Sequence, residues 1–105
     1  MKKIYSEKYL ERALCDMVKK ADGLCIKLLC HQFLGLPDRL CLFPGGSLCF
    51  AEIKTTGKKP TKAQLHVHNI LRGLGFLVFV IDSLEALKAF YISNNIQRYE
   101  NDKSI

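Results

Sequence analysis

The sequence has no apolar run long enough to cross a membrane. Its longest run, Gly75–Ile81, falls far short of the roughly 20 residues that a membrane-spanning helix needs. The first residues, Met1–Lys8, contain no apolar core of the kind that marks a secretory signal. These absences argue against a membrane-spanning or secreted protein and predict one that works in the cytosol.

Cysteine pairing motifs are also missing. The five cysteines are odd in number, and they show no C-x-x-C pair or other spacing typical of zinc ligands. The sequence therefore supports neither a disulfide framework nor a zinc site. We expect the cysteines to be buried as small apolar side chains, and they are Cys15, Cys25, Cys30, Cys41 and Cys49.

Proline is scarce, with three residues, while apolar residues make up 49% of the chain and charged residues 25%. This composition predicts a globular protein, because disordered chains have too little apolar surface to fold. The 105 residues give room for a single domain, expected over 1–96 and followed by a polar, loose tail over 97–105. The net charge of +6 favours a polyanionic partner, since lysine and arginine beside phosphates release condensed counterions.

Apolar periodicity and turn residues predict an α/β protein in the order α-β-β-β-α-β-α, with a mixed sheet flanked by helices. Two glycines in the short loop Pro44–Ser47 favour a hairpin between the second and third strands. The expected elements are a helix over Ser6–Ala21, strands over Leu24–Cys30, Arg39–Phe43 and Leu48–Lys54, a helix from Thr61 to Gly73, a strand over Phe76–Ile81 and a helix from Asp82 to Asn94.

Three charged residues are placed to converge. Glu52 and Lys54 project from one side of their strand, roughly 7 Å apart, because side chains alternate between the faces of a strand. Asp38 precedes the partner strand of the hairpin, so antiparallel pairing brings it beside Glu52. Two carboxylates that hold Mg²⁺ or Mn²⁺, with a lysine that positions or activates water, form the set that phosphodiester hydrolysis needs. The main-chain carbonyl of Ile53 is a further candidate ligand.

A surface strand of alternating charge gives the same E-x-K pattern without any chemical role. Three features favour function over this simpler interpretation: the Pro37-Asp38 turn, the short glycine hairpin, and the position of Glu52 and Lys54 in an otherwise apolar strand. Two charges are unusual in such a strand unless they have a role.

The motifs resemble a known nuclease family. The VRR-NUC branch of the PD-(D/E)XK nuclease superfamily is similar in its spacing of Gly35-Leu36-Pro37-Asp38, Glu52-Ile53-Lys54 and Gln64. The resemblance covers roughly Glu11–Glu85, which is nearly the whole domain. It implies the superfamily core of a mixed sheet flanked by helices, a requirement for Mg²⁺ or Mn²⁺, and a metal-binding glutamate on the first helix.

The resemblance also bears on biology and on two further residues. Short chains of this family are typically viral or bacterial and act as homodimers on branched DNA such as four-way junctions, which implies the cytosol of a bacterium or phage-infected host. Glu11 is our candidate for the helix glutamate, with Glu7 as the alternative and an exposed helix residue as the plain interpretation of both. Gln64 matches the family's glutamine beside the scissile phosphate, but the T-x-x-Q pattern with Thr61 equally predicts a capping box.

Basic side chains near the proposed site are candidates for contacts with the DNA backbone. The plain interpretation is a solvated loop for the lysines and an accessory or structural role for the histidine. The candidates are Lys27, Lys58, Lys59, Lys62 and His68. A basic nucleic-acid-binding module that keeps the fold but performs no chemistry is the alternative to a nuclease, and the intact set of Asp38, Glu52 and Lys54 argues against it.

Overall fold

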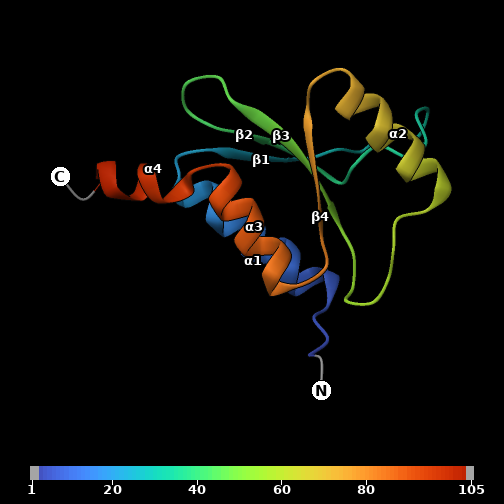
Figure 1. Ribbon diagram of the computed structural model, residues 1–105, viewed down its shortest axis with the longest axis horizontal. Helices are drawn as coiled ribbons and strands as arrows, with labels where there is room; N and C mark the ends of the chain where they lie inside the picture. Colours follow the sequence, from blue (N-terminus) through green and yellow to red (C-terminus); the bar gives the residue numbers. More distant parts are fainter. Residues whose placement is uncertain (1–2, 104–105) are drawn as a thin grey trace.

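The computed structural model describes residues 3–103, with the side chains of residues 3–99. Figure 1 shows one sheet with helices packed against it. The elements are α1 (Glu7–Lys20), β1 (Leu24–Lys27), β2 (Arg39–Leu42), β3 (Leu48–Ile53), α2 (Lys62–Gly73), β4 (Leu77–Ile81), α3 (Leu84–Ser93) and α4 (Ile96–Lys103). The predicted α/β class and the order of its first seven elements are confirmed.

The sheet has the strand order β1-β2-β3-β4. Strands β1, β2 and β3 are antiparallel neighbours, whereas β3 and β4 run parallel and are joined by α2. The sheet is therefore mixed, as predicted. The hairpin register places Arg39 opposite Ala51, and the parallel register places Glu52 opposite Val80.

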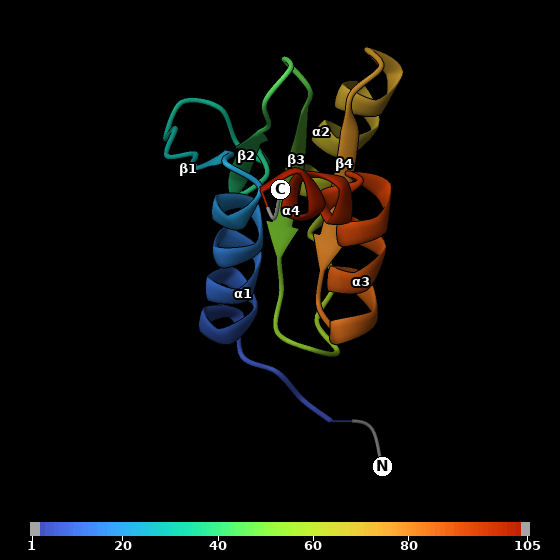
Figure 2. The ribbon, with the colours of Figure 1, turned by 90° about the vertical axis from the view of Figure 1, so that its left-hand side faces the viewer.

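Helices cover both faces of the sheet. Helices α1 and α3 lie side by side on one face, and α2 lies on the other (Figures 1 and 2). The face under α1 and α3 carries the apolar core, to which the side chains of Cys49, Ala51 and Ile53 contribute from β3. Because strand side chains alternate, Phe50 and Glu52 project toward the opposite face, where α2 packs.

The helix starts are set by side-chain caps. Ser6 accepts a hydrogen bond from the backbone N–H of Tyr9 at the start of α1, and Ser83 accepts one from Ala86 at the start of α3. Such caps satisfy backbone donors that have no partner within the helix. In α1 the apolar residues recur every four positions, so the helix buries one continuous stripe made of Leu10, Leu14 and Val18.

The first strand is shorter than predicted. It ends at Lys27 rather than Cys30, because the chain leaves the sheet in a loop that returns at Asp38. The backbone N–H of Leu28 donates to the carbonyl oxygen of Asp38 at 2.8 Å, which closes this loop at its base. Its apolar residues Leu29 and Leu34 are exposed rather than paired in the sheet.

The expectation of a loose tail from residue 97 is wrong as far as Lys103, because this segment forms α4. Ile96 is fully buried in the core, and the ring of Tyr99 stacks on Phe43 at a centroid distance of 6.0 Å. Two apolar contacts therefore dock a segment whose other residues are polar. No helix among the described residues is long and apolar enough to span a membrane.

Candidate active site

Asp38 and Glu52 meet where β2 begins and β3 ends. Since Arg39 pairs with Ala51 in the antiparallel register, Asp38 lies across from Glu52. Oδ2 of Asp38 accepts a hydrogen bond of 2.7 Å from the backbone N–H of Ile53, which fixes the Asp38 carboxylate against β3. The structure thus brings together the two carboxylates that the hairpin arrangement predicts.

The carboxylate of Glu52 is enclosed by two residues of α2. Gln64 donates from Nε2 to Oε2 of Glu52 at 3.1 Å, and Nε2 of His68 lies 3.2 Å from Oε1. Glu52 is 1% exposed and His68 is 0% exposed. A buried carboxylate is costly unless its oxygens have partners, and each oxygen has one here. Helix α2 therefore orients both oxygens of Glu52.

The electrostatics of Glu52 are those of a carboxyl group crowded by its surroundings. Its pKa is raised to about 8. Burial is the largest cause, followed by a hydrogen bond with Asp38 and by the negative charge of Asp38. The positive charge of Lys54 lowers this pKa, and the negative charge of Glu7 raises it. Two adjacent carboxyl groups that repel one another are a donor set that a hard divalent cation fits, because the ion offsets both charges.

No group of three or more histidine, cysteine, aspartate or glutamate side chains is placed to hold a metal ion in the described part of the chain. A magnesium-type site does not need three, because this ion keeps several waters and binds through one or two carboxylates. The pair Asp38 and Glu52 meets that requirement. The carbonyl of Ile53 lies in the chain between Glu52 and Lys54, as the sequence already indicated.

His68 lies within this site and not on a DNA-facing surface. We predicted a contact with DNA for it, and the complete burial of its side chain excludes a direct one. Burial lowers its pKa, and the positive charge of Arg72 lowers it further, so the ring is neutral at pH 7. Nδ1 is buried without a hydrogen-bond partner among the described residues. An unpaired acceptor costs less than an unpaired N–H, which places the proton on Nε2, toward Glu52.

Gln64 forms the predicted capping box and also contacts Glu52. Its Oε1 accepts from the backbone N–H of Thr61 at 2.9 Å, and its own N–H donates to Oγ1 of Thr61 at 3.2 Å, which completes the capping box. The other end of the same side-chain amide donates to Glu52. The cap thus fixes the orientation of the amide that contacts the carboxylate.

Lys54 directly follows β3. Its backbone N–H donates to the carbonyl oxygen of Ile81 at 3.0 Å, so the pairing with β4 extends one residue past the strand. Its side chain is partly exposed, and its charge lowers the pKa of Glu52. The structure therefore places this cation within electrostatic range of the carboxylate pair.

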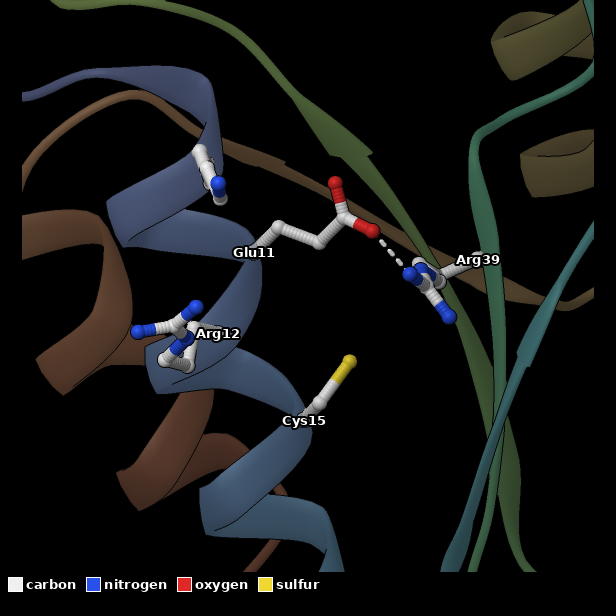
Figure 3. A pocket seen from close by; sticks show the side chains of 5 residues that line it. Glu11, Arg12, Cys15 and Arg39 are labelled. Carbon is white, nitrogen blue, oxygen red and sulfur yellow. Dashed lines mark hydrogen bonds and ion pairs between the residues drawn. The ribbon is translucent and has the colours of Figure 1, made fainter.

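The structure does not bring Glu11 to the carboxylate pair. Its carboxylate forms an ion pair with the guanidinium of Arg39, beside a pocket that Cys15 and Arg12 also line (Figure 3). Arg39 shares the sheet face of Ala51, which α1 covers, and the neighbouring Asp38 points to the other side. The sequence did not predict this pair, because no motif marked Arg39 as a partner of Glu11.

Glu7 lies one turn earlier on α1 and is exposed. Its charge contributes to the raised pKa of Glu52. The preceding segment is tied to the loop after Lys54: Tyr5 donates from its backbone N–H to Oγ1 of Thr56 at 2.9 Å, and Thr56 donates back to the carbonyl oxygen of Tyr5 at 3.2 Å. These bonds hold the start of α1 beside the loop that follows β3.

The remaining basic candidates lie on the surface. Lys58, Lys59 and Lys62 are exposed, in the loop from β3 to α2 and in the first turn of α2. Lys27 is exposed at the end of the edge strand β1, opposite Arg39. All four side chains can reach a polyanion without any change in the core.

Comparisons with known proteins cover most of the chain. The protein named Putative nuclease p44, from Acyrthosiphon pisum secondary endosymbiont phage 1, is 38% identical over 81 residues, which are 77% of this chain and 87% of the phage protein. A solved structure described as a VRR-NUC domain superposes with a TM-score of 0.77 and 27% identity over 85% of this chain and 97% of its own. No model of a protein family matches the sequence. The similarity thus extends well beyond one motif.

Proposed function

Because the chain belongs to the VRR-NUC family of nucleases, we propose that it hydrolyses phosphodiester bonds of DNA with a divalent metal ion held by Asp38 and Glu52. The observation that carries this proposal is the meeting of these two carboxyl groups within electrostatic range of Lys54. Mg²⁺ or Mn²⁺ suits carboxylate oxygens and a main-chain carbonyl, which Ile53 offers. When bound, such an ion would polarise the scissile phosphate and lower the pKa of a water.

The residues of the chain have distinct tasks in this mechanism. Asp38, fixed by the N–H of Ile53, and Glu52, fixed by Gln64 and His68, hold their oxygens in place before substrate arrives. Such preorganisation avoids rearrangement during the reaction. Lys54 offsets the negative charge that develops on the phosphate and positions the attacking water.

A carboxylate of α1 is the further ligand that the resemblance implies, and Glu11 and Glu7 are the two candidates. To reach the ion, Glu11 would have to exchange Arg39 for it. Glu7 already acts on Glu52 and needs no such exchange. We therefore favour Glu7. Glu7→Gln should require more Mg²⁺ for half-maximal cleavage, and Glu11→Gln should require the same concentration as wild type. The reverse order would assign the ligand to Glu11.

Contacts with the DNA backbone are assigned to four exposed lysines, Lys58, Lys59, Lys62 and Lys27. Each lysine that touches a phosphate releases condensed counterions, so binding should weaken steeply with salt. Replacing Lys58 and Lys59 together by alanine should reduce the slope of log affinity against log salt by roughly 2. An unchanged slope would remove this loop from the interface.

A homodimer on branched DNA is the finer part of the proposal. Side chains at the end of α2 and the start of β4 are apolar and exposed, with Leu74 at 69% and Leu77 at 52%. Strand β4 is an edge of the sheet, and exposed apolar side chains at one place mark interaction surfaces. Two symmetric subunits would suit the paired cuts of a four-way junction.

Light scattering tests the dimer. Wild type should have twice the chain mass of 11.9 kDa. Leu74→Glu with Leu77→Glu should reduce it to one chain mass, whereas Leu29→Glu, in an exposed loop position elsewhere, should not change it. A wild-type monomer at micromolar concentration would contradict the dimer and with it the argument for symmetric junctions.

Cleavage of circular plasmid, flap and four-way-junction DNA tests the activity. Wild type should cut in Mg²⁺ or Mn²⁺ and not in EDTA, and nicking of the closed circle would establish an endonuclease. Asp38→Asn and Glu52→Gln should abolish cutting, while Glu85→Gln, an exposed acid in the first turn of α3, should preserve it. Cutting in EDTA, or active variants of the pair, would overturn the proposal. Strong salt-sensitive binding without cleavage would identify a binding module.

A further inference from the structure

Four of the five cysteines form a row that the proposed mechanism does not use. Cys25, Cys41 and Cys49 are direct register partners across β1, β2 and β3. Cys15 of α1 extends the row, with its Sγ 3.2 Å from Sγ of Cys25. Cys41 and Cys49 are fully buried, whereas Cys15 and Cys25 are partly exposed. The row therefore has an inner, inaccessible end and an outer end near the surface.

The outer end adjoins an opening in the surface. A pocket of about 290 Å³ is lined by Lys8, Glu11, Arg12, Cys15 and Arg39. Figure 3 shows the side chain of Cys15 extending from α1 toward the sheet below the Glu11–Arg39 pair. A molecule the size of hydrogen peroxide can reach Cys15 through this pocket, and Cys25, in contact with Cys15, is itself partly exposed. Of the residues that line it, Arg39 lowers the pKa of Cys25 and Glu11 raises it.

The two outer thiols differ in acidity. A hydrogen bond from Cys41 lowers the pKa of Cys25 to about 6, and Arg39 acts in the same direction. Burial raises the pKa of Cys15 to about 12, with the contact to Cys25 adding to it. These contacts therefore favour the thiolate at Cys25 and the protonated thiol at Cys15.

The contact between the two sulfurs is close to bonding geometry. A disulfide has an S–S distance of about 2.05 Å, so a side-chain rotation that shortens the present 3.2 Å would join α1 to β1. No set of three or more cysteine, histidine or acidic side chains among the described residues is arranged as a metal site. The row therefore offers redox chemistry and not metal binding.

We propose that Cys15 and Cys25 are a thiol-oxidation site, at which hydrogen peroxide or a related hydroperoxide converts the pair to a disulfide. The sulfur of Cys25 attacks one peroxide oxygen: an S–O bond forms, the O–O bond breaks, and the hydroxide released takes a proton from solvent. The sulfur of Cys15, losing its proton, then attacks Cys25. The S–S bond forms, the S–O bond breaks, and the departing hydroxide takes up that proton. The two thiols lose two electrons, and one peroxide becomes two waters.

Peptide mapping of the oxidised full-length chain tests the assignment. After hydrogen peroxide and blocking of free thiols, trypsin should release Ala13–Lys19 and Ala21–Lys27 joined by a disulfide. Dithiothreitol should separate them. The exposed Cys30 lies outside the row, so Cys30→Ser is the matched control and should give the same linked peptides. Cys15→Ser should prevent the link and leave Cys25 as the oxidised residue.

Thermal unfolding gives a second measurement that does not depend on how Cys15→Ser folds. A disulfide between α1 and β1 constrains the unfolded chain, so oxidised Cys30→Ser protein should unfold at least about 5 °C above its reduced form. A link between Cys25 and Cys41, oxidation of Cys30 before the pair, or a sulfinic acid at Cys25 without any link would each overturn the proposal. None of these results depends on nuclease activity.

Discussion

Nε2 of His68 lies 3.2 Å from Oε1 of Glu52, and both side chains are buried between the sheet and α2. The two residues come from different elements, so their contact forms only when α2 packs on β3. The neutral ring, with its proton on Nε2, donates a hydrogen bond to the carboxyl group that we assign to metal binding. Such outer partners fix the orientation of a ligand and raise its basicity.

Replacement of His68 by phenylalanine keeps the ring in place and removes the donor. We expect the Mg²⁺ concentration for half-maximal cleavage to rise roughly 10–100-fold, because the Glu52 carboxylate loses one of its two orienting partners. The measurement is a metal titration of plasmid nicking. His66→Phe, at an exposed position of the same helix, should behave as wild type. An unchanged titration for His68→Phe would mean that Gln64 alone orients Glu52.

Proton binding by Glu52 makes stability depend on pH. The pKa is about 8 in the folded chain against an ordinary 4.5, so folding stabilises the protonated form. The favourable contribution is present below about pH 4.5 and is lost as the pH rises through about 8. Glu52→Gln has no ionisable side chain at this position, so its stability does not fall in this way. In EDTA its free energy of unfolding should therefore rise relative to wild type between about pH 5 and about pH 8, and then level off.

Urea unfolding at several pH values measures this difference. Glu85→Gln, which removes an exposed carboxylate from α3, should keep a constant difference from wild type over the same range. If the difference in free energy of unfolding between Glu52→Gln and wild type also stayed constant, Glu52 would have its ordinary pKa in the folded protein. In the presence of Mg²⁺ the wild-type loss at high pH should disappear, because the ion competes with the proton.

Gly35 is required where the loop before β2 touches α2. Its φ is +92°, and a Cβ would lie 2.5 Å from the carbonyl oxygen of Ala63 and 2.9 Å from Val67. Gly35→Ala should lower the free energy of unfolding by about 2–3 kcal/mol through backbone strain and collision together. It should also slow cleavage, since the same loop carries Asp38. The measurements are urea unfolding and plasmid nicking.

Gly57→Ala separates strain from collision. Gly57 has a similar φ of +91°, but a Cβ there would meet nothing within 4 Å. Its loss of stability should be near 1 kcal/mol, which is the cost of a non-glycine residue in this conformation. Equal losses at the two positions would show that the contact with Ala63 relaxes freely.

Glu11 stabilises Arg39. The guanidinium side chain is 14% exposed, and its Nε has no hydrogen-bond partner among the described residues. Glu11→Gln should therefore lower the free energy of unfolding by about 1–2 kcal/mol, because a largely buried cation loses its counterion. Glu7→Gln changes an exposed carboxylate and should stay within about 0.5 kcal/mol of wild type in EDTA. Equal stability of the two variants would contradict this role for Glu11.

The sequence was sufficient to predict the contacts that depend on strand pairing. Asp38 and Glu52 could be placed together because an antiparallel hairpin with a short loop has few possible registers. The capping box of Thr61 and Gln64 was readable because it involves only neighbours along the chain. Both are local consequences of the order of residues.

Other contacts depend on how separate elements pack. The position of His68 beside Glu52 requires the crossing of α2 over the sheet, and spacing showed only that His68 shares a side with Gln64. The pair of Glu11 with Arg39 requires the face on which Arg39 lies. In the tail, docking of α4 rests on Ile96 and Tyr99, two apolar residues too few to give a periodic signal.

The two faces of β3 have different surroundings. Cys49, Ala51 and Ile53 pack into the apolar core under α1 and α3, while Glu52, to which we assign metal binding, contacts α2 on the opposite face. A scan of substitutions along this strand should thus alternate in phenotype with a period of two, with loss of folding at one residue and loss of cutting at the next. Substitutions in α2 and its flanking loops should therefore alter cutting while the apolar core behind the sheet stays intact.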